Sequence, residues 1–178
     1  MSEQLRSELS HGERSLSSPS PERLRAWRLY LESALALIDV LNAESERDAG
    51  ISLRWYDVLV HLDETSEGLR MNVLAERILY SKSGLTRVVD RMEEAGFVRR
   101  VRPEKDRRSI LVVLTDKGRD KLEQARHHHR LGLEEHFSRH LADADIRALT
   151  RAFEKISDHA RALRPGASAA TGSTSRDS

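Results

Sequence analysis

The sequence contains no cysteine among its 178 residues. Disulfide bonds, thiolate metal ligands and thiol-based redox sensing are therefore all excluded. A chain of this length buries enough apolar surface to fold without such cross-links. We expect one folded domain, and any regulation that it undergoes must use chemistry other than that of thiols.

Long apolar runs and catalytic signatures are also missing. No stretch approaches the roughly 18 apolar residues that span a bilayer, and the serine-rich start lacks the apolar core of a signal peptide. We therefore expect a cytoplasmic protein without membrane contact. The sequence has no Gly-rich phosphate loop and no nucleophile elbow. We expect neither enzymatic activity nor a cofactor.

The net charge is only +1, but the charges are unevenly distributed. Between Asn72 and Arg108 there are ten Lys or Arg against six Asp or Glu, so this segment carries +4 and the rest of the chain about −3. Positive charge gathered in one segment is typical of proteins that bind a polyanion such as DNA. The alternative interpretation is an ordinary solvated face.

Apolar periodicity is absent from the two ends of the chain and helical between them. Residues 1–20, with seven serines, and the small, polar residues 165–178 are expected to be disordered tails. The spacing predicts a long helix from Pro21 to about Arg47. A second helix, capped by Ser52, is predicted to run to about Glu64.

The next segment predicts two short helices joined by a tight turn, followed by a β-hairpin. Asn72 is a candidate N-cap for the first short helix, and the second is expected from Lys82 to Ala95. Runs of β-branched residues and arginine at 97–102 and 109–114 predict the hairpin, with a basic tip between them.

Two long helices are predicted to complete the fold. Thr115 is expected to cap the first, which runs to about Leu141, and the second ends near Leu163. The fold class is therefore mainly α with a small β-hairpin wing. We expect a winged helix-turn-helix lobe at about 52–115 within a folded region of 21–164, flanked by helices at 21–49 and 116–164.

This order of elements is typical of proteins that bind double-stranded DNA. The second helix of a helix-turn-helix enters the major groove, and arginines at a wing tip are attracted to the narrow minor groove. Short hydroxyl side chains suit phosphates, and arginine suits a guanine edge. The residues that we expect to contact DNA are Ser81, Lys82, Ser83, Thr86, Arg87, Arg91, Lys105, Asp106, Arg107 and Arg108.

Three stretches resemble the MarR family of multiple-antibiotic-resistance-type regulators. They are Met71–Ala75, Ser83–Arg100 and the wing motif Asp106–Gly118, in which Asp-x-Arg is followed by a strand and Leu-Thr-x-x-Gly. The resemblance extends over roughly Leu24 to Leu163. It implies a repressor that binds a palindromic operator as a homodimer formed by the first helix and the last two. It also implies that Asp106 and Arg108 form the wing pair, with Arg108 in the minor groove.

The apolar surplus on the outer helices points to the same assembly, because one small monomer could not bury it. The resemblance further implies a small aromatic or carboxylate effector, bound between these helices and the DNA-binding lobe. Candidate ligand residues are Trp27, Tyr30, Arg54, Trp55, Tyr56, His61 and Arg70. The alternative is that the aromatic side chains belong to the core.

A histidine cluster leaves a second regulatory class open. His127, His128 and His129 fall on one predicted helix with His136 and His140, and the last two have the i, i+4 spacing of metal ligands. Zinc-sensing relatives have a His-rich stretch here, but their site also needs a ligand one turn earlier and acids or histidine from the second helix, and Ala125 and Asp57 occupy the comparable places. We predict no metal site, with a response to pH as one role for the cluster. Zinc regulation and a winged-helix protein-interaction module are the alternatives.

Overall fold

The computed structural model describes residues 18–78, 83–103 and 109–163. They divide into two compact units, Met1–Val40 and Leu41–Ser178. The long helix α2 (Pro21–Glu44) occupies the first unit and enters the second, where it continues as a π-helical turn, Ser45–Ala49. In the described part of the chain, no helix is both long and apolar enough to span a membrane.

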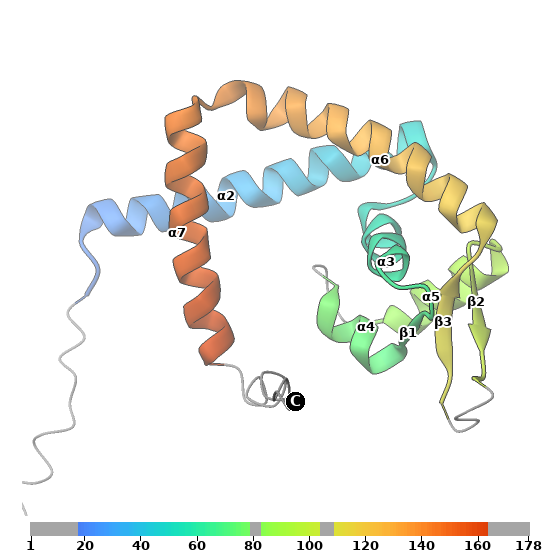
Figure 1. Cartoon of the computed structure of the whole chain (residues 1–178). Coiled ribbons are helices and arrows are strands. Elements are labelled where there is room, and N and C mark those ends of the chain that lie inside the picture. The colour runs from blue at the N-terminus through green and yellow to red at the C-terminus, as the bar shows by residue number, and fades with distance from the viewer. Residues whose placement is uncertain (1–17, 79–82, 104–108, 164–178) are drawn as a thin grey trace, which may run out of the picture. The chain divides into compact units, whose positions relative to one another are not determined.

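The second unit holds a small sheet and the remaining helices (Figure 1). Its elements follow in the order α3 (Leu53–Asp63), β1 (Leu69–Arg70), α4 (Met71–Arg77), α5 (Leu85–Glu94), β2 (Val98–Val101), β3 (Leu111–Leu114), α6 (Asp116–His136), a 3₁₀ turn (Ser138–His140) and α7 (Asp143–Ala162). The mainly α fold with a β-hairpin wing is thus confirmed.

The predicted hairpin is part of a sheet with the strand order β1-β3-β2 in the described region. Strands β2 and β3 are antiparallel, with Val98 opposite Leu114 and Val101 opposite Leu111. The short β1 pairs with the other edge of β3. Gly68 leads into β1 at a φ of 84°, and a Cβ there would lie 2.4 Å from the Val112 carbonyl oxygen. Only glycine fits this approach.

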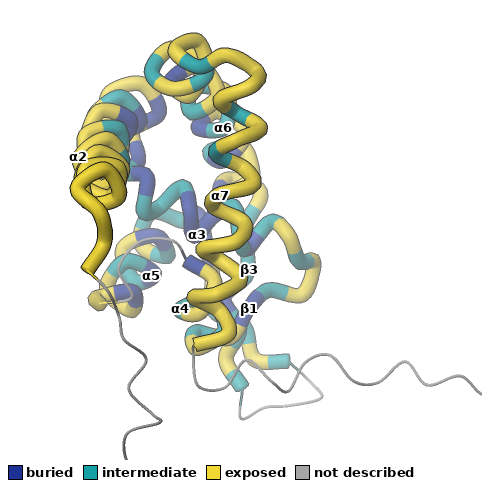
Figure 2. The backbone as a smooth tube through the Cα atoms, turned by 90° about the vertical axis from the view of Figure 1, so that its left-hand side faces the viewer, coloured by how far each residue is buried: buried dark blue, intermediate teal, exposed yellow. Residues whose placement is uncertain are grey.

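One apolar core joins the helices to the sheet. It draws fully buried side chains from α3, α4, α5, the sheet and α6, which include Val58, Leu59, Leu62, Leu74, Val89, Met92, Val112 and Leu122. By contrast, α7 is exposed along most of its length, as Figure 2 shows. The buried side chains therefore hold the sheet and helices α3 to α6 together as one lobe.

Side-chain caps fix the starts of α3 and α6, as the sequence predicts. The Ser52 hydroxyl accepts a hydrogen bond from the Trp55 N–H at 3.3 Å, and the Thr115 hydroxyl accepts one from the Gly118 N–H at 3.0 Å. Such caps satisfy backbone donors that a helix start leaves unpaired. Gly118 also lets α6 cross the sheet closely, because a Cβ there would lie 2.0 Å from the Phe97 carbonyl oxygen.

Several predicted boundaries are wrong. Helix α4 starts at Met71 with Arg70 as its N-cap, so Asn72 lies inside the first turn and does not cap it. Helix α5 starts at Leu85 and not at Lys82, because Gly84 has a left-handed φ of 72°. The strands are also shorter than the predicted runs 97–102 and 109–114.

Of the two long helices, the one that begins at Pro21 reaches its predicted end, whereas α6 ends before the predicted Leu141. Helix α2 changes to π-helical turns after Glu44 and stops at Gly50, whose φ is 68°. Helix α6 ends at His136, because Phe137 leaves the helical region with φ −127° and ψ −64°. His136 and His140 therefore do not share one α-helix, and the i, i+4 pair that the sequence suggested is not formed.

Candidate nucleic-acid interface

Helix α5 has one buried face and one exposed face. Leu85, Val89 and Met92 are buried in the core, whereas Thr86, Arg87 and Arg91 are exposed. This division agrees with the sequence prediction. Of the other expected contacts, Ser83 lies in the exposed turn before the helix, and Ser81, Lys82 and the wing-tip residues Lys105, Asp106, Arg107 and Arg108 lie outside the described residues.

The start of α5 is held by an arginine from α3. Arg54 donates a hydrogen bond from Nη2 to the backbone carbonyl of Ser83, immediately before the left-handed Gly84. The sequence suggested Arg54 as a partner for an effector carboxylate. In the structure its guanidinium instead contacts the turn that opens the candidate recognition helix.

The last two turns of α5 are tied to the wing by Arg100 of β2. Its guanidinium lies 2.6 Å from Oδ1 of Asp90 and also donates to Glu93. Partial burial opposes ionisation of Arg100, but its hydrogen bonds to Asp90 and Glu93 outweigh this effect and raise the pKa of the guanidinium. Arg100 was not among the residues predicted from the sequence. The available signal was the spacing of Asp90 and Glu93, which lie one helical turn apart shortly before β2 and can bind one cation together.

Exposed cations surround this braced region. Arg87 and Arg91 of α5, Arg99 of β2 and Arg102 after it are all exposed, and none of them forms an ion pair with any described acid. Their charge is therefore available to a partner in solution. Exposed arginines on a rigid helix and an adjacent strand are suited to contact with phosphates and base edges.

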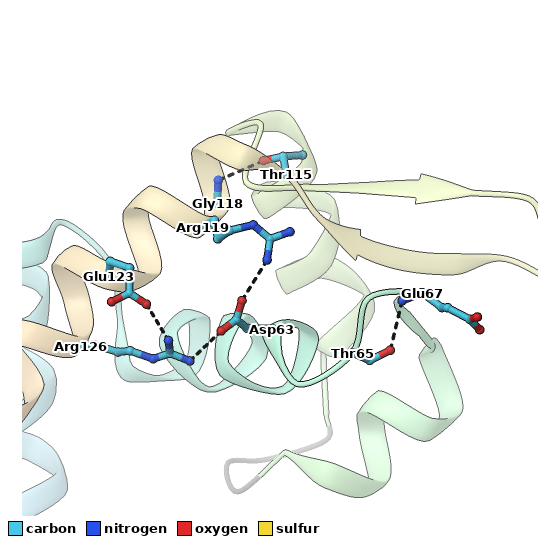
Figure 3. A network of polar contacts seen from close by, with 8 residues as sticks. All are labelled: Asp63, Thr65, Glu67, Thr115, Gly118, Arg119, Glu123 and Arg126. Carbon is cyan, nitrogen blue, oxygen red and sulfur yellow. Dashed lines mark hydrogen bonds and ion pairs between the residues drawn. The ribbon is translucent and has the colours of Figure 1, made fainter.

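An ion-pair network connects α3 to α6 (Figure 3). Asp63, at the end of α3, accepts hydrogen bonds from Arg119 at 3.1 Å and from Arg126 at 2.9 Å. Arg126 also donates to Glu123 at 2.6 Å. One carboxylate thus binds two arginines that lie seven residues apart on α6.

Tyr56 and His129 meet at the interface between α3 and α6. Their ring centroids are 4.8 Å apart, and burial raises the pKa of Tyr56 and lowers the pKa of His129. Within the described residues, Nδ1 of His129 is buried and has no hydrogen-bond partner. Of the candidate effector residues, Tyr56 is the one that the structure places against this polar group.

The other candidate effector residues lie in different surroundings. Trp55 packs edge-on against Phe97 at 5.9 Å, in agreement with the core interpretation. His61 lies 3.5 Å from Asp57 and 3.4 Å from Glu64. Arg70 is exposed at the start of α4. Trp27 and Tyr30 are on the part of α2 in the first unit, with their rings 5.8 Å apart.

The histidines of α6 and of the 3₁₀ turn after it do not converge. His136 lies 2.8 Å from Glu44, His140 lies 3.1 Å from the Glu135 carbonyl oxygen, and the rings of His127 and His128 contact each other. Across the part of the chain that the structure describes, no group of three or more metal-ligating side chains is close enough to hold an ion.

The family model that matches the chain is that of the MarR family, over residues 49–109. The HTH-type transcriptional regulator YkoM of Bacillus subtilis is 32% identical over 126 residues, which cover 69% of this chain and 80% of YkoM. The chain belongs to the MarR family of transcriptional regulators. The first curated relatives are matched over only 49% to 59% of their own length.

Solved structures of MarR-family regulators share the fold over most of this chain. AbsC from Streptomyces coelicolor is 34% identical, with a TM-score of 0.72, over 82% of this chain and 99% of AbsC. Sco3205 from the same organism, solved in complex with DNA, is 30% identical, with a TM-score of 0.73, over 84% of this chain and 96% of Sco3205. The family that the motifs indicated is thus confirmed.

The lowered pKa of His129 predicts a stability that depends on pH. Burial disfavours the charged imidazolium of His129, so its pKa is lower in the folded than in the unfolded chain, where it is near 6.5. The contribution of this group to stability is therefore complete above the unfolded pKa and is lost as the pH falls through the folded pKa. We expect the melting temperature to fall between pH 7.5 and 5.5, and His129→Gln to weaken this dependence. Thermal denaturation followed by circular dichroism measures it.

The matched control is His127→Gln, at an exposed position two residues earlier on the same helix. It should keep the pH dependence of the parent chain. Equal pH profiles for the parent and His129→Gln would contradict the interpretation that burial of this imidazole matters.

Proposed function

We propose that this MarR-family chain is a sequence-specific DNA-binding repressor that acts as a homodimer on a palindromic operator. The observation that carries the proposal is the exposed face of α5, where Thr86, Arg87 and Arg91 stand on a helix whose other face is buried. The complex of the similar regulator Sco3205 with DNA supports it. In a symmetric dimer the two recognition helices would lie about 34 Å apart, one turn of DNA.

Each element has a distinct role in this proposal. Major-groove contacts come from short hydroxyl side chains, which suit phosphates or bases, and from arginines, which suit base edges and phosphates. They are Ser81, Ser83, Thr86, Arg87 and Arg91, with Lys82 as a further contact. At the wing tip, Arg107 and Arg108 enter the minor groove, with Lys105 nearby and Asp106 orienting Arg108. Helices at 21–49 and 116–164 form the dimer, around the winged helix-turn-helix lobe at 52–115.

Arg87→Ala tests the major-groove contact. If Arg87 reads a base, the variant should lose about 1 to 3 kcal/mol of operator binding and change the preferred base at one position. Fluorescence anisotropy on an operator selected from a random duplex pool gives the affinity, and a second selection with the variant gives the preference. Arg108→Ala, measured in parallel, should weaken binding through the minor groove.

Arg151→Ala, at an exposed position on α7 outside the candidate DNA contacts, serves as the control: sedimentation should find it as dimeric as the parent chain, and it should then bind DNA like the parent. An unchanged base preference in Arg87→Ala would reduce Arg87 to a phosphate contact. Binding by the parent that hardly depends on salt would instead favour the protein-interaction module, because phosphate contacts release counterions.

The apolar side chains that the outer helices expose support the proposed dimer. Leu35 on α2 is 64% exposed, Ile156 on α7 is 61% exposed, and Leu163, the residue after α7, is 68% exposed. A monomeric protein rarely leaves so many large apolar side chains in water. In a two-fold dimer the same side chain of both copies is buried, so each apolar position contributes two side chains to the interface.

Ile156→Glu should therefore weaken the dimer. Loss of two buried isoleucines raises the dimer dissociation constant by at least about a hundredfold, at roughly 1.5 kcal/mol for each side chain. Sedimentation velocity over a range of concentrations measures the change. The neighbouring exposed Lys155→Glu controls for the added charge, and a dimer equally strong in both variants would exclude α7 from the interface.

We also propose a small aromatic carboxylate as the effector, held beside Tyr56 and His129. The half-buried Tyr56 ring and the unpaired Nδ1 of His129 offer an aromatic surface and a polar group at one place between α3 and α6. An effector here releases DNA if it binds the free form more tightly than the DNA-bound form.

Phenolic acids should therefore reduce the operator affinity of the parent chain and should have less effect on His129→Gln. Anisotropy titrations with each acid, and with zinc in its place, measure this response. His127→Gln is the control and should respond like the parent. A response to zinc alone that His129→Ala abolishes would replace the aromatic effector with a metal.

A further inference from the structure

Helix α5 carries three carboxylates, Asp90, Glu93 and Glu94, and the first two of them contact Arg100 of β2. Asp90 and Glu93 lie one turn apart, and Arg87 and Arg91 are within one turn of Asp90. On a helix that approaches DNA, each carboxylate would repel the phosphates that the arginines attract. The helix therefore needs a way to offset the charges of Asp90 and Glu93.

Arg100 supplies that offset from outside the helix. Its Nη2 lies 2.6 Å from Asp90 Oδ1, its Nη1 donates to Glu93 Oε2, and its backbone N–H donates to Glu93 Oε1 at 2.7 Å. The side chain is only 26% exposed. Both terminal nitrogens of the guanidinium are thus engaged by α5, in the forked geometry that arginine allows and lysine does not.

The neighbouring residue on β2 has the opposite environment. Arg99 is exposed and, within the described residues, forms no ion pair. Successive side chains of a strand point to opposite faces, which explains the difference. Two adjacent arginines with equal charge therefore occupy different settings, one facing α5 and one facing solvent.

We propose that Arg100 is a positioning and specificity residue that acts on DNA only through Asp90 and Glu93. It cancels their charge at the helix and ties β2, and with it the wing, to the recognition helix. The position of β2 relative to the recognition helix is thereby fixed. This inference rests on the proposed DNA-binding function.

A double-mutant cycle in DNA binding separates this role from a direct phosphate contact. In the parent chain, Arg100→Ala should weaken operator binding about tenfold or more, because two carboxylates lose a partner at a partly exposed site. In a chain that carries Asp90→Asn and Glu93→Gln, the same substitution should have an effect of less than about twofold, since neither carboxylate partner of Arg100 is left. The salt dependence in that background should also stay the same.

Arg99→Ala is the matched control and should have the same effect in both backgrounds. Equal losses for Arg100→Ala in the two backgrounds would overturn the proposal and make Arg100 a phosphate contact. If Arg100→Ala does not fold, Arg100→Gln keeps most of the stem and takes its place. Circular dichroism and sedimentation establish the fold and assembly of every variant before binding is compared.

The two proposals fail in different ways. A parent chain that binds no duplex overturns the proposed function, and this role for Arg100 with it. A parent that binds its operator while the cycle shows no coupling overturns the role of Arg100 alone. The same cycle in urea denaturation without DNA should show coupling between Arg100 and the two acids, and independent effects there would also contradict the proposal.

Discussion

The exposed face of α5 depends on the burial of its opposite face. Val89 and Met92 have no exposed surface, and they pack in one core with side chains of α3, α4 and the sheet. Each such side chain contributes on the order of 1.5 to 3 kcal/mol through its removal from water. A short helix of ten residues is marginal by itself, so this packing is what keeps a row of polar and charged groups in a fixed direction.

Hydrogen bonds and ion pairs add to the orientation that the apolar core gives α5. Arg54 holds the turn at the start of α5, and Arg100 holds its last two turns. Both arginines come from neighbouring elements, so the orientation of α5 is specified by α3 and β2 together. In a MarR-family regulator such preorganisation matters, because a recognition helix that moved freely would lose entropy on binding.

Sequence patterns predicted the elements well and their contacts poorly. Ser52 and Thr115 could be recognised as caps because a hydroxyl before an apolar helical pattern acts locally. The start of α5 was misplaced because Gly84 could be read as part of the turn or of the helix, and only its left-handed backbone decides. The contacts of Arg54 and Arg100 with α5 could not be predicted, since their partners are set by tertiary packing.

For the candidate site, the exposed positions of Thr86, Arg87 and Arg91 followed from helical periodicity. The contact between Tyr56 and His129 did not, because it joins two helices that are distant in sequence.

The two hydrogen bonds that Asp63 accepts from α6 restrict how α3 and α6 can move relative to each other. Arg119 and Arg126 reach the same carboxylate from points two helical turns apart, so they approach it from opposite directions along the helix axis. If α6 slid along its axis or turned about it, at least one of the two contacts would lengthen. A tilt of α3 and α6 together preserves both. The two contacts therefore favour joint movement of α3 and α6 over sliding of one helix along the other.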